Sequence, residues 1–76
     1  MSIERGEKLE ELTKNLRSLR KSFSLTQRQV ADKLNIKYQS YQAYETGEVL
    51  PDIKKLIILA DIYDVSIDFL VGRRDI

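Results

Sequence analysis

The chain has 76 residues, a formal net charge of +1 and 42% apolar residues, which fits one small domain with a core of its own. It contains no cysteine and no histidine, so disulfides, thiolate nucleophiles, imidazole bases and ordinary zinc sites are excluded. Its acidic residues are scattered and it has no glycine-rich phosphate loop, so we expect neither an enzyme nor a cofactor-binding protein.

The charges are distributed unevenly along the chain. Residues 14–37 carry seven basic groups against one acidic group, a net charge of +6, whereas residues 38–72 carry two against six, a net charge of −4. Such asymmetry can give a nearly neutral protein one basic face that suits nucleic acid. The alternative is that these charges only keep the helices soluble.

We expect the protein to be cytoplasmic and not associated with a membrane. Its longest apolar run, residues 56–60, is far too short to cross a bilayer. The N-terminus is charged and lacks the apolar segment of a signal peptide.

The first predicted helix follows a polar segment, residues 1–8, that contains Gly6. This segment is either a frayed leader or an early helical turn begun at Ser2. From Leu9 onward, apolar residues recur at steps of three and four, which predicts an amphipathic helix that ends near Ser22 and packs beneath the next two helices. Its apolar stripe consists of Leu9, Leu12, Leu16, Leu19 and Phe23.

The second helix has strong start and stop signals. Thr26 can cap the opening turn while Gln29 reaches back, and Leu25 and Val30 have the spacing of a hydrophobic staple. Asn35 tolerates the left-handed conformation that ends a helix, so a sharp three-residue turn follows. The inward face of this helix is expected to hold Val30, Ala31 and Leu34.

A third helix is predicted over residues 38–46, with Gly47 as its C-terminal cap. Helical periodicity groups Ser40, Tyr41 and Tyr44 on one side. It groups Gln39, Gln42 and Thr46 on the other, flanked by Tyr38 and Ala43. Because glutamine can bond adenine bidentately, the amide-rich face suits the DNA major groove, although a merely solvated polar face would have the same pattern.

A fourth helix starts at Pro51 and Asp52 and runs to about Tyr63. Its inner face is expected to hold Ile53, Leu56, Leu59, Ala60 and Tyr63. Three further residues, Ile57, Ile58 and Ile62, widen the apolar arc beyond what a surface helix needs, and Ile58 and Ile62 are either covered by a partner or packed at the domain's edge. Ser66 caps a last helix over residues 67–71, closed by Gly72. The sequence thus predicts an all-α fold, a compact bundle of five short helices over residues 9–72, with a leader at 1–8 and a tail at 73–76.

Over about residues 16–72 the sequence resembles the Cro/CI-type helix-turn-helix domain, the lambda-repressor-like or xenobiotic response element family. The marks lie in the family's order. They are Leu19-Arg20, Leu25-Thr26-Gln27, Val30-Ala31 with Leu34, Tyr44-Glu45-Thr46-Gly47, Pro51, Leu56 with Leu59-Ala60, and Asp64-Val65-Ser66-Ile67-Asp68 before Phe69-Leu70.

The resemblance implies that residues 38–46 form a recognition helix whose N-terminal part enters the major groove. It implies base contacts by Lys37, Tyr38, Gln39 and Gln42. Gln27 would bond a phosphate through its side chain and the adjoining amides, with Arg28, Lys21 and Thr46 as further phosphate-contacting candidates. Arg20 and Glu45 would form a structural ion pair between the first and third helices.

Three departures from the family pattern stand out. Lys37 occupies a turn position that often holds serine or threonine, and it cannot supply an oxygen cap. Glu48, Val49 and Leu50 follow Gly47 where basic residues are common. Tyr38 is bulky for its position, and we expect it to stack or to touch a thymine methyl group.

We therefore expect a sequence-specific transcriptional regulator, a repressor that binds double-stranded DNA at a near-palindromic operator as a homodimer. Its control would come from its abundance, from a regulatory protein partner or from proteolysis. Its dimer surface is expected to involve Val65, Phe69 and Val71, extended by Ile58 and Ile62. The alternative is a protein-interaction module, antitoxin-like or an anti-regulator, that uses the apolar fourth helix. Steep salt dependence of binding would distinguish the DNA-binding protein.

Overall fold

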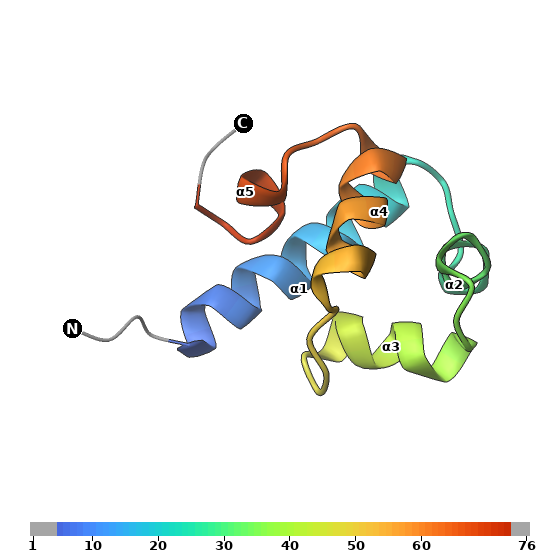
Figure 1. Ribbon diagram of the computed structural model, residues 1–76, viewed down its shortest axis with the longest axis horizontal. Coiled ribbons are helices and arrows are strands. Elements are labelled where there is room, and N and C mark those ends of the chain that lie inside the picture. Colours follow the sequence, from blue (N-terminus) through green and yellow to red (C-terminus); the bar gives the residue numbers. More distant parts are fainter. Residues whose placement is uncertain (1–4, 74–76) are drawn as a thin grey trace.

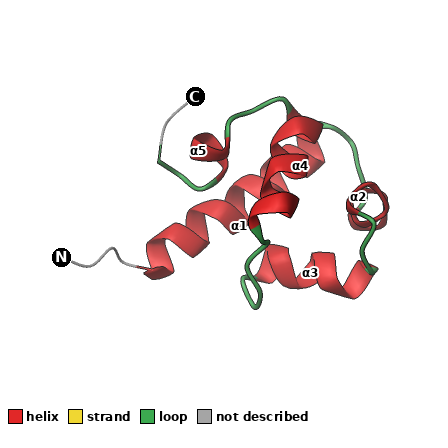
Figure 2. Ribbon diagram, in the orientation of Figure 1, coloured by secondary structure: helices red, strands yellow, loops and turns green. Residues whose placement is uncertain are grey.

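The computed structural model describes residues 5–73, with side chains from Glu10 onward. Within that range there are five helices and no strand, as Figures 1 and 2 show, so the predicted all-α bundle of five helices is confirmed. The helices are α1 (Arg5–Ser22), α2 (Gln27–Leu34), α3 (Tyr38–Thr46), α4 (Ile53–Tyr63) and α5 (Ile67–Leu70). None of these described helices has the length and apolar character needed to traverse a bilayer.

The long helix α1 runs through the middle of the bundle, and α2 lies at the edge, apart from it (Figure 1). In that view α4 crosses α1, α2 is seen end-on, and α3 lies in the plane of the picture, so α2 and α3 are steeply inclined to each other. α3 packs against both α2 and α1, and α5 packs against α1 and α4. The helix-turn-helix pair therefore occupies one side of the molecule.

The caps of α2 and the C-terminal cap of α3 are those predicted, whereas α5 ends at Leu70, with Val71 and not Gly72 as its C-cap. Thr26 Oγ1 accepts a hydrogen bond from the Gln29 amide at 3.0 Å, and Gln29 Oε1 accepts one from the Thr26 amide at 2.8 Å, which completes a capping box. Asn35 and Gly47 end α2 and α3 in the left-handed conformation, with φ of 58° and 86°. These local signals fix the turn between α2 and α3.

Residues 5–8, which the sequence left open as part of a frayed leader or of an early helical turn, are helical. α1 begins at Arg5, since Glu7 and Lys8 are good helix formers that extend the helix across Gly6. Residues 1–4 of the expected leader lie outside the described residues, as do residues 74–76 of the expected tail and the side chain of Leu9.

The core lies where α1, α2, α3 and α4 meet. Its buried apolar residues are Leu12, Leu16, Val30, Ala31, Leu34, Tyr41, Tyr44, Leu59, Ala60, Tyr63 and Leu70. Ile58 and Ile62 are half-buried and pack against this core. Their wide apolar arc on α4 is therefore largely used within the domain.

Two residues assigned to inner faces are in fact exposed. Ile53 is 62% exposed, because at about 100° per residue it lies about 70° from the centre of the buried arc and in the first turn of α4. Phe23 is 48% exposed, since it follows the last residue of α1. Its ring meets that of Tyr63 edge to face, with centroids 5.2 Å apart.

A buried carboxylate ties the first three helices together. The side chain of Glu45, on α3, is 3% exposed and its Oε2 lies 2.6 Å from Arg20 Nε, on α1. Tyr41 Oη donates to the same oxygen at 2.5 Å, and Gln27 Nε2, on α2, donates to Oε1 at 3.0 Å. Burial alone would raise the pKa of Glu45, but the hydrogen bonds from Arg20, Tyr41 and Gln27 outweigh it and hold the pKa below 4.5.

The last helix is held to the first by a side chain that the sequence analysis did not single out. Asn15 Nδ2 donates to the backbone oxygens of Phe69 and Leu70, at 2.9 and 3.1 Å. Just beyond, Gly72 has φ of 82°, and a Cβ there would lie 2.6 Å from Glu11 Cβ. The chain after α5 thus passes directly over α1 at a position where only glycine fits.

We expect Arg20→Met to lower the free energy of unfolding by about 3 to 5 kcal/mol, because it leaves the Glu45 carboxylate buried without its cation. Urea denaturation followed by circular dichroism measures this loss. Lys21→Met, an equivalent change at the next and exposed position of α1, is the control and should cost less than about 0.5 kcal/mol. Equal losses for the two variants would contradict a structural role for the pair.

We also expect stability to fall at both ends of the pH range. The pKa of Glu45 is lowered in the folded state, so its contribution is present above pH 4.5 and is lost as the pH falls through the lower folded value. Burial raises the pKa of Tyr63 to about 12 from 10.0, so its contribution is present below pH 10 and is lost between pH 10 and 12. Urea titrations at each pH measure both limbs, and Glu45→Gln should flatten the acid limb.

Candidate nucleic-acid interface

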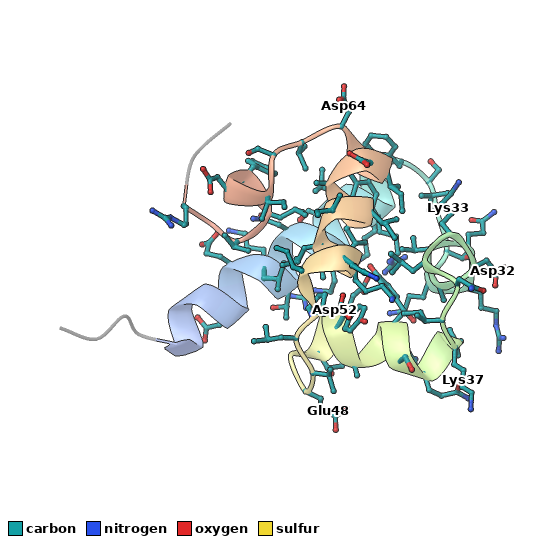
Figure 3. The ribbon with its side chains drawn as sticks, in the orientation of Figure 1. Asp32, Lys33, Lys37, Glu48, Asp52 and Asp64 are labelled. Atoms are coloured by element: carbon teal, nitrogen blue, oxygen red, sulfur yellow. The ribbon has the colours of Figure 1, made fainter. Side chains whose placement is uncertain are left out.

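The outer face of α3 presents polar groups at its N-terminal end. Lys37, the residue before the helix, is exposed and supplies no side-chain cap, and Gln39 is exposed beside it. Figure 3 shows Lys37 pointing outward at this end and Glu48 pointing outward beyond the other end of α3. The cation and the free amide therefore lie together, away from the acidic end.

The inner face of α3 differs in one residue from the predicted one. Tyr41 and Tyr44 are buried, as expected, and their rings meet edge to face with centroids 6.0 Å apart. Ser40 is exposed, since it lies about 90° from the centre of the buried arc, whereas Glu45 is buried in its place.

Two backbone amides remain open at the start of α2. The described residues provide no acceptor for the backbone N–H groups of Gln27 and Arg28, because Thr26 caps only the Gln29 amide. A shallow hollow adjoins these amides, lined by Arg20, Leu25, Thr26, Gln27, Arg28 and Tyr38. Open amides and a guanidinium beside a hollow form a site suited to an anion.

The side chain of Gln27 is committed within the protein. Its nitrogen donates to Glu45, and its oxygen lies 3.5 Å from Gln42 Nε2 on α3. The family resemblance implied that this side chain bonds a phosphate. In the structure it is the backbone amides of α2, and not the Gln27 side-chain nitrogen, that are free for such a contact.

Tyr38 is accommodated by stacking and by a hydrogen bond. The Arg28 guanidinium lies over its ring, with the central carbon 4.3 Å from the ring centroid. Its hydroxyl oxygen accepts a hydrogen bond from Gln42 Nε2 at 2.9 Å. The phenol therefore connects α2 to the outer face of α3, and both Tyr38 and Gln42 are half-buried.

The other predicted site residues are spread over the surface. Lys21 is exposed at the end of α1, and Thr46 Oγ1 donates to the Ala43 oxygen at 3.2 Å. The five residues expected at a dimer surface are all half-buried, and Ile58, Ile62, Val65 and Val71 pack against the core. The large apolar side chains that are most exposed lie elsewhere, with exposures of 47 to 62%; they are Phe23, Val49, Leu50, Ile53 and Ile57.

Two anchoring side chains of α1 were not predicted from the sequence. Arg17 Nη1 donates to the backbone oxygen of Glu45 at 2.8 Å, and Asn15 holds α5. The role of Asn15 could have been predicted, because it lies three positions after Leu12 and four before Leu19. A polar residue at that spacing lies on the apolar face and needs a buried partner. Arg17 is exposed, and nothing in its spacing distinguishes it from its neighbours.

Comparisons with known proteins identify the domain. A helix-turn-helix family model matches residues 16–70. The HTH-type transcriptional regulator YobD of Bacillus subtilis is 47% identical over 60 residues, which cover 79% of this chain and 54% of that protein. The cryptic phage CTXphi transcriptional repressor RstR of Vibrio cholerae is 42% identical over 62 residues, 82% of this chain and 55% of that protein.

A solved structure agrees with these matches. The crystal structure of a transcriptional regulator from Listeria innocua aligns with a TM-score of 0.77 and 43% identity, over 80% of this chain and 57% of that one. The chain spans about half the length of the curated relatives that it matches. The chain has the capped helix pair and the order of five helices described above, and a helix-turn-helix family model matches most of it. It therefore belongs to the Cro/CI-type helix-turn-helix family.

Proposed function

We propose that the chain is a sequence-specific DNA-binding transcriptional regulator of the cytoplasm, and that it acts as a repressor. The observation that carries this proposal is the exposed N-terminal end of α3, where Lys37 and Gln39 flank Tyr38, whose side chain lines the same hollow as Gln27 and Arg28. Known relatives of about twice its length carry the names of regulators, and one is a phage repressor. Neither enzymatic activity nor a cofactor forms part of this function.

We place α3 in the major groove. A short helix fits that groove, and its N-terminal residues then meet base edges. Lys37 can donate to the acceptors of guanine, and the free amide of Gln39 can bond adenine bidentately. Tyr38 lies between these two residues, and its hydroxyl accepts a hydrogen bond from Gln42 one turn further along the helix, so the four candidate base-contacting residues form one group.

We assign phosphate binding to the start of α2. In this docking the first helix of the motif crosses the backbone, so the open amides of Gln27 and Arg28 face a phosphate. The Arg28 guanidinium adds charge at the same hollow. Lys21 and Thr46 are candidates for flanking phosphates, because both are exposed.

We further propose that two copies bind a near-palindromic operator, with half-sites about one helical turn, roughly 34 Å, apart. The dimer surface would use the outward edges of Val65, Phe69 and Val71, extended by Ile58 and Ile62. These side chains are half-buried, so each keeps apolar surface available.

A protein-interaction module remains the second candidate, because one apolar patch is unusually exposed. The patch covers the segment after α3 and the first turns of α4, and its residues are Val49, Leu50, Ile53 and Ile57. The most exposed of them is Ile53, at 62%. A contact made by this patch would respond little to salt, whereas DNA binding through several phosphates weakens steeply as salt rises.

The deciding experiment is selection of bound duplexes from a random DNA pool at moderate salt, together with the mass of the protein in solution. A palindromic consensus and a dimeric mass support the regulator. Absence of any enriched sequence contradicts it and favours the interaction module.

Within the selected operator, we expect Gln39→Ala to abolish the preference at one base pair, at a cost of about 1 to 3 kcal/mol, and to leave the melting temperature nearly unchanged because the residue is exposed. Fluorescence anisotropy with single-base variants of the operator measures the preference. Ser40→Ala, at the next exposed position, is the control. A fall in melting temperature would mean that Gln39 serves the fold.

We expect Arg28→Ala to weaken binding to all sequences about equally and to reduce the slope of log affinity against log salt by about 1. Titrations between low and moderate salt measure the slope. Lys33→Ala removes the same charge from the last turn of the same helix and should leave the slope unchanged. An altered consensus with Arg28→Ala would show that Arg28 reads bases instead.

A further inference from the structure

A chain of hydrogen bonds leads from the buried carboxylate to the outer face of α3. Glu45 Oε1 accepts from Gln27 Nε2 at 3.0 Å, Gln27 Oε1 lies 3.5 Å from Gln42 Nε2, and Gln42 Nε2 donates to Tyr38 Oη at 2.9 Å. We call these four residues the Glu45–Tyr38 relay. It joins a group that is 3% exposed to two of the side chains that are proposed to contact bases.

The buried end of the relay fixes the direction of its hydrogen bonds. An ionised carboxylate can only accept, and the Glu45 carboxylate faces Arg20, whose positive charge favours the ionised form. Gln27 must therefore turn its NH₂ group toward Glu45. Its carbonyl oxygen then faces Gln42, as an acceptor.

This orientation in turn fixes Gln42. Because both neighbours present an oxygen, at Gln27 Oε1 and Tyr38 Oη, both N–H groups of the Gln42 amide are directed within the protein. The reverse orientation would set the carbonyl oxygen of Gln42 against that of Gln27. Only Oε1 of Gln42 is left for a ligand, and the Tyr38 hydroxyl hydrogen is left free.

Gln39 provides the contrast on the same helix. It is exposed, and within residues 5–73 its side chain makes no hydrogen bond. Its amide can present a donor and an acceptor together, which is what bidentate binding of adenine needs. Gln42 has lost the donor half of that pair, so the two glutamines differ in what they can read.

We propose that Gln42 reads DNA as a hydrogen-bond acceptor only, selecting a base that offers an amino group in the major groove, with Gln27 and Tyr38 as positioning residues. Adenine N6 and cytosine N4 are such groups, whereas guanine and thymine present only acceptors there. The inference rests on the proposed DNA-binding function and deepens it. It assigns a shared A-or-C preference to Gln42 and an A preference to Gln39.

The test measures base preference in the full chain. The base pair read by Gln42 is the one at which Gln42→Ala flattens the selected consensus. On the strand that Gln42 faces, the unaltered protein should bind operators with adenine or cytosine at that pair about tenfold more tightly than those with guanine or thymine.

Two variants each remove one hydrogen-bond acceptor of the Gln42 amide and keep the amide itself. Tyr38→Phe deletes the hydroxyl acceptor and Gln27→Met deletes the carbonyl acceptor, so each returns a donor to Gln42. Each should shift the preference at that pair toward adenine over cytosine by about fivefold, while the preferences at the pairs assigned to Lys37 and Gln39 persist. Ser40→Ala, which removes an exposed hydroxyl from the same helix, should change nothing. Thermal melts establish that each variant is folded.

The opposing outcomes are distinct. If no sequence is enriched by the unaltered protein, the DNA-binding function fails and this inference with it. If a consensus exists but no pair depends on Gln42, or that pair selects adenine alone, guanine or thymine, only the relay inference fails.

A measurement without DNA tests the relay itself. In nuclear magnetic resonance spectra of the free protein, the Gln42 side-chain NH₂ protons should give cross-relaxation to the Tyr38 ring protons next to the hydroxyl. Absence of that contact in the folded protein would overturn the relay whatever the DNA preference.

Discussion

The structure depends on one buried carboxylate. Glu45 is on α3, yet its charge is met by Arg20 of α1, by Gln27 of α2 and by Tyr41 one turn earlier on its own helix. Burying a charge is costly unless each of its lone pairs finds a donor, and here the donors come from three different helices. The angle between α2 and α3 is therefore set by polar geometry as well as by the apolar core beneath it.

This dependence links the interior to the surface. Arg17 and Arg20 hold the end of α3 from below, while Gln27 extends the network to Gln42 and Tyr38 above. Arg28 covers the Tyr38 ring from α2. The face proposed to meet DNA is thus partly preorganised, which reduces the conformational entropy that binding must overcome.

The sequence was sufficient for features that depend on neighbouring residues in the chain. The helix ends at Thr26, Asn35 and Gly47 could be predicted, because capping involves only groups a few residues apart. Ile53 and Phe23 were misplaced, because the burial of an apolar residue at the edge of a stripe depends on whether another helix happens to reach it.

The candidate site likewise has one feature that the sequence predicts and one that it does not. The periodicity of α3 was enough to bring Gln39 and Gln42 to one face, but not to reveal that the partners of Gln42 come from Tyr38 and from another helix. Side-chain amides have many possible partners, and spacing cannot choose among them.

Gln39 and Gln42 also differ in how easily each can be replaced during evolution. An exposed Gln39 can be exchanged in one mutational step, leaving every internal contact intact. Gln42 shares its hydrogen bonds with Gln27 and Tyr38, so a change of the base that it contacts should require substitutions at all three positions. Among related proteins, residue 39 should therefore vary before residue 42.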